Sequence, residues 1–294
     1  MRYLFSTAPA EISPALDSTS VLNPESFVSA EELEASAERL ATNAVRRSGG
    51  TSPRDFLAIL QDETESIEAT ENELTSIAIG ERLPVEDWLH DNLYVVREQM
   101  WAVRRDLTRG YYQSLPKLLE PPFTGLPRVY ALACELTARA GGRIDGDVLQ
   151  RFVQAYQRVT DLSIGELWAL PSMLRAAQLR HLAQLTKEVR DRRRQRAAAG
   201  RFVASYQRAS DKSTGAFRVE FHLPRTPSPT YIVQLIHDLR DLPPAAGDLW
   251  QELEERLGAR DTRIDEITQQ EHTREAFLQL AVSNLIGSMR RTSA

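Results

Sequence analysis

Apolar residues recur every three or four positions along most of this chain, and this spacing constrains the fold more than any other feature. Leu33, Ala37, Leu40 and Ala44 form one such stripe, and similar stripes follow it toward the C-terminus. Strand-like alternation occurs in FRVEFHL, from Phe217 to Leu223. Because one strand cannot make a sheet, the sequence predicts an all-α protein, a multi-helix bundle of amphipathic helices with a proline-rich loop.

Start and stop signals place the individual helices. Ser29 to Glu32 has the form of a capping box, and Pro53 stands where a helix needs no amide partner. We expect helices over residues 29–48, 53–77, 84–110, 128–140, 145–160, 163–199, 231–239, 245–257 and 265–289. Pro171 lies inside the sixth of these and predicts a kink there. Four prolines and one glycine between Leu115 and Pro127 predict an ordered loop.

Composition divides the chain into four segments. Residues 1–25 are rich in Ser, Pro, Ala and Thr without sustained periodicity, which predicts a mobile leader. Residues 26–200 are expected to form the main helical domain, and residues 201–229 a basic and proline-rich linker. Residues 230–294 then form a C-terminal helical segment.

One 15-residue stretch occurs twice. RFVQAYQRVTDLSIG, from Arg151 to Gly165, returns as RFVASYQRASDKSTG, from Arg201 to Gly215, with nine of 15 positions identical. The flanking residues do not align, and repeat arrays need about three or more copies to bury a continuous core. We therefore interpret the echo as a local duplication or chance, and not as a solenoid.

The charge balance argues against several classes of partner. The chain has 36 basic and 41 acidic residues, a net charge of −5, so nucleic acid is not an expected partner. Eight basic residues from Arg190 to Lys212 could attract a membrane surface, but such runs are usually solvated helix faces. The N-terminus has no export signal, and charges interrupt every long apolar run. We expect no transmembrane segment and a cytoplasmic location.

Metal and cofactor chemistry is not indicated. Cys134 is the single cysteine, and the five histidines have no i, i+4 companion, so a zinc site is not expected. Asp145 and Asp147 form an Asp-x-Asp pair that could hold a divalent ion, but their position favours helix capping. The sequence has no phosphate-loop or nucleophile-elbow motif. We therefore expect no metal and no cofactor.

The densest cluster of candidate contact residues lies around the proline-rich loop. Its arginines and tyrosines can hydrogen-bond and stack on sugars, or bind phosphate. The alternative is structural: a helix C-terminus that favours cations, followed by a loop that tyrosines pin to the core. The candidates are Arg105, Arg109, Tyr111, Tyr112, Arg128 and Tyr130.

A second cluster contains Glu166, Trp168 and Arg175. Glu166 could act as an acid or base, because burial against Trp168 would raise its pKa. The alternative is a capping box, since Glu166 follows Ser163 by three residues at the start of an apolar stripe. Without a placed partner carboxylate, the sequence does not support glycosidase chemistry.

The order of these motifs resembles the N-terminal region of the cyclic β-1,2-glucan synthase family. The resemblance covers about residues 70–290, with a fainter match over its last part. The matching segments are WLHDN (88–92), RRDL (104–107), RGYY (109–112), LPKL (115–118), PRVY (127–130), AYQ (155–157), LSIGELWALP (162–171) and MLR (173–175), then DEI (265–267) and NLIGSMR (284–290).

The resemblance implies a place in glucan biosynthesis. Members of this family are large inner-membrane proteins that polymerise glucose from UDP-glucose into β-1,2 chains and close them into rings. Their nucleotide-sugar motifs and membrane helices have no counterpart in this chain. The resemblance therefore implies a truncated or split protein, a non-catalytic accessory or scaffold module at the inner face of the inner membrane. Its partners would be the remaining synthase modules or a membrane glycosyltransferase.

Two alternatives remain open. One is a β-1,2-glucan binding module that uses Tyr111, Tyr112, Tyr130, Trp168 and the arginines. The other is a hydrolase centred on Glu166.

Overall fold

The computed structural model describes residues 28–46, 49–75, 83–212, 224, 227–240, 250–251, 253, 255, 257 and 263–293. The predicted leader over residues 1–25 and the strand-like stretch from Phe217 to Leu223 lie outside these residues. So do residues 213–223, 225 and 226 of the predicted linker.

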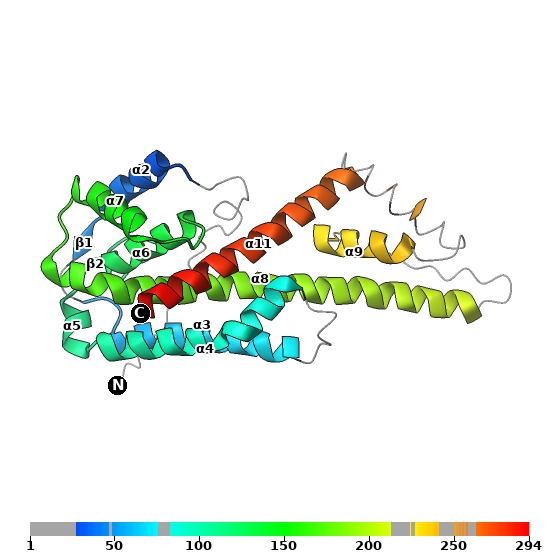
Figure 1. The fold of residues 1–294 in the computed structure, drawn as a ribbon, viewed down its shortest axis with the longest axis horizontal. Coiled ribbons are helices and arrows are strands. Elements are labelled where there is room, and N and C mark those ends of the chain that lie inside the picture. Colours follow the sequence, from blue (N-terminus) through cyan, green and yellow to red (C-terminus); the bar gives the residue numbers. More distant parts are fainter. Residues whose placement is uncertain are drawn as a thin grey trace, which may run out of the picture. The chain divides into compact units, whose positions relative to one another are not determined.

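The all-α prediction is confirmed (Figure 1). Two short strands, β1 (Val45–Arg46) and β2 (Lys117–Leu118), form an antiparallel pair with Val45 opposite Leu118. No described helix is long and apolar enough to cross a membrane. The helices are α2 (Ala30–Ala41), α3 (Pro53–Thr75), α4 (Pro84–Asp106), α5 (Arg109–Ser114), α6 (Arg128–Arg139), α7 (Gly146–Gln157), α8 (Ile164–Lys212), α9 (Pro229–Arg240) and α11 (Ile264–Ser293).

Local caps start three of these helices where the sequence predicts them. At α2, Ser29 Oγ accepts from the Glu32 amide at 3.2 Å and the Glu32 carboxylate accepts from the Ser29 amide at 3.0 Å. Ser52 Oγ accepts from the Asp55 amide at the start of α3. At α7, Asp145 accepts from the Val148 amide at 2.9 Å, so this residue of the Asp-x-Asp pair serves as a helix cap.

Three helix ends differ from the prediction. The first helix stops at Ala41, because the chain then turns so that the Ala44 carbonyl and β1 can pair with the segment around β2. The third helix breaks after Asp106, and α5 begins at Arg109. The helix predicted to end near Ala199 continues to Lys212, and Pro171 lies inside it.

The two copies of the 15-residue echo adopt different structures. In the first copy, α7 ends at Gln157 and α8 begins only at Ile164. In the second copy, residues 201–212 continue α8 without a break. The difference agrees with a local duplication or chance and not with a structural repeat.

The chain folds into two compact units, each made from separate stretches. The first contains Met1–Glu65, Asn92–Leu182 and Asn284–Ala294, and the second contains Ser66–Asp91 and Ala183–Ser283. These stretches cross the predicted boundaries at residues 200 and 230. The division into domains at those positions therefore stays a prediction about independent folding.

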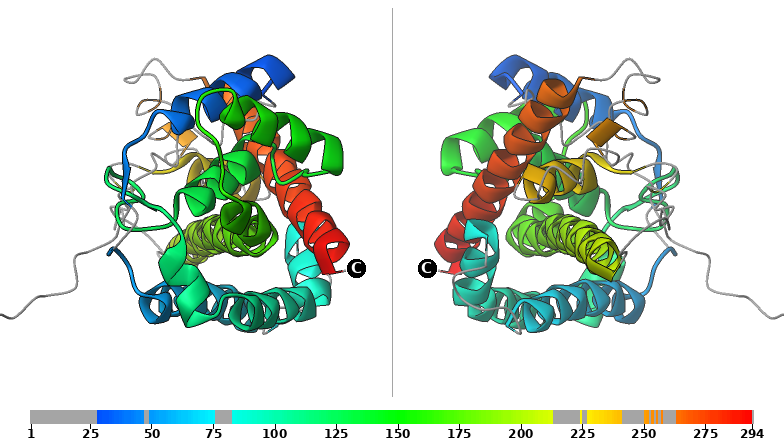
Figure 2. Two further views of the ribbon diagram at one scale, coloured as in Figure 1. Left: turned by 90° about the vertical axis from the view of Figure 1, so that its left-hand side faces the viewer. Right: turned by 90° about the vertical axis from the view of Figure 1, so that its right-hand side faces the viewer.

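An aromatic cluster lies in the core of the first unit. The Phe56 ring stacks on Tyr112 at 5.1 Å between centroids and meets Tyr130 edge-on at 5.0 Å. Phe123 meets Tyr130 from another side at 6.0 Å. In the same unit α2 packs against α7 and α6, and Figure 2 shows α2 lying across α7. Segments distant in sequence thereby form one core.

The second unit has its own apolar core. Ala199 and Val203 of α8 pack with Tyr231 and Leu235 of α9, which lies beside the last part of α8 in Figure 1. Ile267 of α11 completes the cluster, together with Leu253 and Leu257. This burial explains why α8 continues past Ala199, since the added turns cover apolar surface.

Gly142 provides a test of the packing in the first unit. Its φ is +76°, and a Cβ added there would lie 2.6 Å from Leu285 Cγ. We expect Gly142→Ala to lower the free energy of unfolding by about 2 kcal/mol or more, from backbone strain and overpacking. Urea denaturation measures the change.

The matched control is Gly110→Ala. Gly110 lies in α5, and an added Cβ would meet nothing within 4 Å. This variant should be neutral or stabilise the protein by up to about 1 kcal/mol. Equal stabilities for the two variants would contradict the close approach of Gly142 to α11.

Candidate functional site

The nine predicted contact residues all lie in the first unit, but they differ in exposure. Tyr112, Tyr130, Arg128 and Glu166 are buried. Arg105, Arg109 and Trp168 are exposed, while Tyr111 and Arg175 are partly buried.

Tyr112 and Tyr130 belong to the aromatic core around Phe56. Tyr112 is also covered by Lys117, whose Nζ lies 3.8 Å from the ring centroid and donates to the Tyr112 carbonyl at 2.6 Å. Neither tyrosine is exposed to a ligand, because both side chains are almost completely buried. This burial favours the structural alternative for the two tyrosines over direct contact with sugar, which stays a prediction.

Arg128 and Glu166 form a buried, bidentate ion pair. Arg128 Nε donates to Glu166 Oε1 at 2.5 Å, and Nη2 donates to Oε2 at 2.9 Å. Arg128 Nη2 also donates to the Asp161 carbonyl at 2.8 Å. Glu166 in turn accepts from the Ser163 amide and hydroxyl at 2.9 and 2.8 Å, which completes the predicted capping box at the start of α8.

These contacts correct the prediction about the acidity of Glu166. Burial alone would raise its pKa, but the hydrogen bonds from Arg128 and Ser163 outweigh burial and hold the pKa below its ordinary value. Trp168 does not bury the carboxylate, since it is itself 77% exposed. A fully paired carboxylate of low pKa is poorly suited to deliver a proton.

The remaining candidates hold the start of α8 to neighbouring segments. The Tyr111 hydroxyl donates to the Gly165 carbonyl at 2.6 Å. Arg175 pairs with Asp106 at 3.1 Å and donates to the Thr292 carbonyl at 2.6 Å. These residues tie α5, α4 and the end of α11 to the first turns of α8.

Arg105 lies on the outer surface of α4. Its guanidinium pairs with Asp106 and lies 4.8 Å from the centroid of the Trp101 ring. Trp101 is 62% exposed, so this arginine and ring form a surface pair that a ligand or partner can reach.

Sequence reasoning missed a buried polar cluster in the first unit. Arg180 donates a hydrogen bond to the Glu63 carboxyl at 3.2 Å, and Tyr130 and Cys134 lie near Arg180. Burial raises the pKa of Glu63 to about 7, Asp62 adds to the rise, and Arg180 opposes it. In the sequence Glu63 is one of several acids on α3. The signal that could have found it is its spacing from Phe56 and Leu60, which places it on the same face of the helix.

Sequence reasoning also missed the burial of Lys117. It is buried, and burial lowers its pKa to about 8. The sequence places it between Leu115 and Leu118 in the proline-rich loop, where a lysine is usually exposed. Its contacts with Tyr112 give it a structural role in holding the loop.

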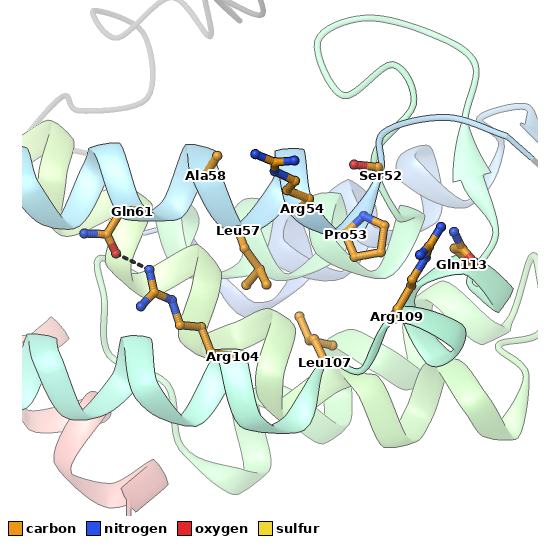
Figure 3. A pocket seen from close by; sticks show the side chains of 10 residues that line it. All are labelled: Ser52, Pro53, Arg54, Leu57, Ala58, Gln61, Arg104, Leu107, Arg109 and Gln113. Carbon is orange, nitrogen blue, oxygen red and sulfur yellow. Dashed lines mark hydrogen bonds between the residues drawn. The ribbon is translucent and has the colours of Figure 1, made fainter.

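A groove of about 760 Å³ opens between α3 and the segment that links α4 to α5 (Figure 3). Leu57 and Leu107 lie between the helices, while Arg104 and Arg109 reach from the lower segment toward α3. Arg104 donates a hydrogen bond to Gln61. Of the predicted contact residues, Arg109 lines this groove.

Four of the eight basic residues from Arg190 to Lys212 form ion pairs among the described residues of the second unit. Arg192 meets Glu271 at 2.6 Å, and Arg194 meets Glu73 at 2.9 Å. Arg196 meets Glu275 at 3.2 Å. Acids of the second unit therefore compensate part of the local positive charge, which weakens the case for a membrane or nucleic-acid surface.

The buried ion pair generates a stability prediction. Arg128→Met leaves the Glu166 carboxylate buried without its main partner, so it should lower the free energy of unfolding by about 3–5 kcal/mol at pH 7. Because the pKa of Glu166 is lowered in the folded state, this contribution is present at neutral pH and is lost as the pH falls below the ordinary value. The difference between wild type and variant should therefore shrink in acid.

Arg158→Met is the matched control, since Arg158 forms exposed pairs with Glu34 and Glu38. Its loss of unfolding free energy should be much smaller than that of Arg128→Met, because exposed ion pairs are screened by solvent. Urea denaturation from pH 3 to pH 7 compares the variants, and equal losses at neutral pH would refute the special role of the buried pair.

A second prediction concerns Glu63. The folded protein keeps a proton on this carboxyl up to about pH 7, whereas its ordinary pKa is 4.5. The stability that this group contributes is thus complete below pH 4.5 and is lost as the pH rises through 7. Between pH 5 and pH 8, ionisation of Glu63 should cost the wild type up to about 3 kcal/mol of unfolding free energy. Glu63→Gln should not show this loss.

The neighbouring Asp62→Asn serves as the control, because Asp62 is exposed and is a minor cause of the shift. Asp62→Asn should keep most of the dependence of the unfolding free energy on pH that wild type shows. If wild type and Glu63→Gln lost equal stability between pH 5 and pH 8, the carboxyl would be ionised in the folded state.

Comparison with known proteins supports the resemblance drawn from the motifs. No protein-family model matches the chain. The chain is 29% identical over 266 residues, 90% of its length, to the cyclic β-(1,2)-glucan synthase NdvB of Rhizobium meliloti (strain 1021). It spans only 9% of the length of that curated relative. The chain is thus similar to a short segment of a cyclic β-1,2-glucan synthase.

Proposed function

We propose that this chain is a helical accessory module of a glucan-synthesising system, and that it works by docking to another synthase module. The observation that carries the proposal is the similarity to a cyclic β-(1,2)-glucan synthase along 90% of this chain. The same similarity covers 9% of that protein, so most of the relative lies outside the matched segment. A segment of this kind would act together with the remainder, at the inner face of the inner membrane.

The environment of the candidate residues supports a non-catalytic role. Glu166 is held by Arg128 and Ser163, and its pKa is lowered, which does not suit general acid chemistry. Tyr112 and Tyr130 serve the core. The contacts of these residues build the unit, and they leave its exposed aromatic groups for recognition.

The docking surface that we propose is the apolar patch at the start of α8, formed by Ile164, Leu167 and Trp168. These residues follow one another at i, i+3 and i+4, so they share one face of the helix. Ile164 is 71% exposed, Trp168 is 77% exposed, and Leu167 is also exposed. Contiguous exposed apolar residues with a tryptophan are typical of protein contacts, where aromatic anchors carry much of the binding energy.

The occupant we infer for this patch is another module of the same synthase. The relative extends far beyond the matched segment, so a neighbouring module is available to cover it. The polar network beneath the patch is saturated by Arg128, Ser163 and Tyr111, so the first turn of α8 is held rigid. A rigid anchor loses little entropy when it docks.

A second candidate function is glucan binding by the exposed tryptophans. Trp168 and Trp101 both present rings to solvent, and Arg105 lies over the Trp101 ring. Aromatic faces beside guanidinium donors suit the ring faces and hydroxyls of sugars. Because Tyr112 and Tyr130 are buried, this reading rests on fewer rings than the sequence suggested.

The docking proposal predicts a selective loss of association. Trp168→Ala should weaken binding of this chain to the remainder of the synthase at least tenfold, because the anchor of the patch is lost. Its free energy of unfolding should change by no more than about 0.5 kcal/mol, since the ring is exposed. Analytical ultracentrifugation with the purified remaining synthase region measures the association.

Trp101→Ala is the matched control, because Trp101 is also exposed but lies on α4. It should bind like wild type. Equal affinities for wild type and Trp168→Ala, or no association at all, would refute docking through this patch. Synthesis of β-1,2-glucan from UDP-glucose by this chain alone would refute the accessory role.

Calorimetric titration with β-1,2-linked oligosaccharides tests the second candidate. Heat that is present in wild type and lost in Trp168→Ala would favour glucan binding. An absence of heat with wild type would remove that candidate.

A further inference from the structure

The groove between α3 and the α4–α5 segment has an unusual charge (Figure 3). Three arginines line it, Arg54, Arg104 and Arg109, and among the residues that the structure describes no carboxylate does. The chain as a whole carries a net charge of −5, so this concentration of positive charge is local to the groove.

The state of these arginines differs from that of most others in the unit. Seven arginines of the first unit pair with carboxylates among the described residues. In the groove, Arg104 donates to the neutral Gln61. For Arg54 and Arg109, no hydrogen bond or ion pair with another described residue is found. The groove therefore presents guanidinium groups whose charge the described part of the fold does not neutralise.

The position of Arg54 adds to this imbalance. It lies in the first turn of α3, which begins at Pro53, where the helix dipole disfavours a cation. The acid in the same turn, Asp55, does not line the groove and accepts from the Ser52 hydroxyl at 2.8 Å. Repulsion among the arginines and with the helix end would be relieved by a bound anion.

The other lining groups define what kind of anion fits. Gln61, Gln113 and the Ser52 hydroxyl offer neutral hydrogen bonds, and Leu57 and Leu107 provide an apolar floor. Guanidinium forks match phosphoryl oxygens in pairs. A volume of about 760 Å³ lies within the range of small-molecule sites, about 300–1,000 Å³, and exceeds what one inorganic ion needs.

We propose that this groove binds a small ligand that carries one or more phosphoryl groups, held by Arg54, Arg104 and Arg109. The phosphoryl group could belong to a soluble phosphate or diphosphate ester, or to the headgroup of an anionic lipid. The chemistry of recognition is the same for both sources. The site is separate from the apolar patch on α8 and does not depend on the proposed docking function.

The test uses inorganic pyrophosphate as the soluble probe and vesicles of phosphatidylglycerol as the lipid probe, with phosphatidylcholine vesicles for comparison. Calorimetry at low ionic strength should show binding of pyrophosphate that weakens as salt is added. Arg54→Gln and Arg109→Gln should each weaken it at least tenfold. Because both side chains are exposed, thermal unfolding should remain close to that of wild type.

Arg39→Gln is the matched control, since it removes the same charge from an exposed position on α2 outside the groove. It should bind like wild type. Binding of pyrophosphate with this pattern supports a soluble ligand, and the same pattern with phosphatidylglycerol vesicles alone supports a headgroup. Binding of neither probe, or equal binding by the groove variants and Arg39→Gln, would overturn the proposal.

Discussion

The buried ion pair of Arg128 and Glu166 is the interaction on which the first unit depends most. It joins the first residue of α6 to the first turn of α8, and Arg128 also reaches the Asp161 carbonyl in the connection before α8. Two charges removed from water are costly unless each is fully satisfied. Here the Glu166 carboxylate accepts from Arg128, the Ser163 amide and the Ser163 hydroxyl, so the pairing is complete. The same contacts that stabilise the fold take away the acidity that a catalytic carboxyl would need.

The pairing of arginines with acids determines where each unit exposes positive charge. In the second unit, arginines of α8 pair with acids of α3 and α11, so a stretch that looks strongly basic in sequence is partly compensated. In the first unit seven arginines pair with carboxylates, whereas the groove is lined by three arginines and by no carboxylate of the described residues. An uncompensated cluster costs stability, which is why its chemistry points toward a ligand.

The exposed apolar groups at the start of α8 are the basis of the docking proposal. Ile164 and Trp168 are exposed at a helix start where the Glu166 carboxylate and the Gly165 carbonyl accept hydrogen bonds from Ser163 and Tyr111. In the proposed docking function, the partner of this surface is another module of a synthase like the one to which this chain is similar. Docking through α8 and anion binding at the α3 groove use different residues, so each can be tested while the other is left intact.

The sequence by itself determined the all-α class and most helix starts, because these depend on contacts three or four residues apart. The capping boxes at Ser29 and Ser163 and the cap at Asp145 formed as the spacing indicates. Local spacing did not decide the structure of the 15-residue echo, whose two similar copies end a helix in one place and continue α8 in the other. Only the tertiary structure decided that outcome, and it also decided that Tyr112 is buried while the adjacent Tyr111 reaches Gly165. The reason is physical: burial and ion pairing join residues far apart in the chain, such as Arg128 and Glu166, and local spacing holds no information about which distant groups will meet.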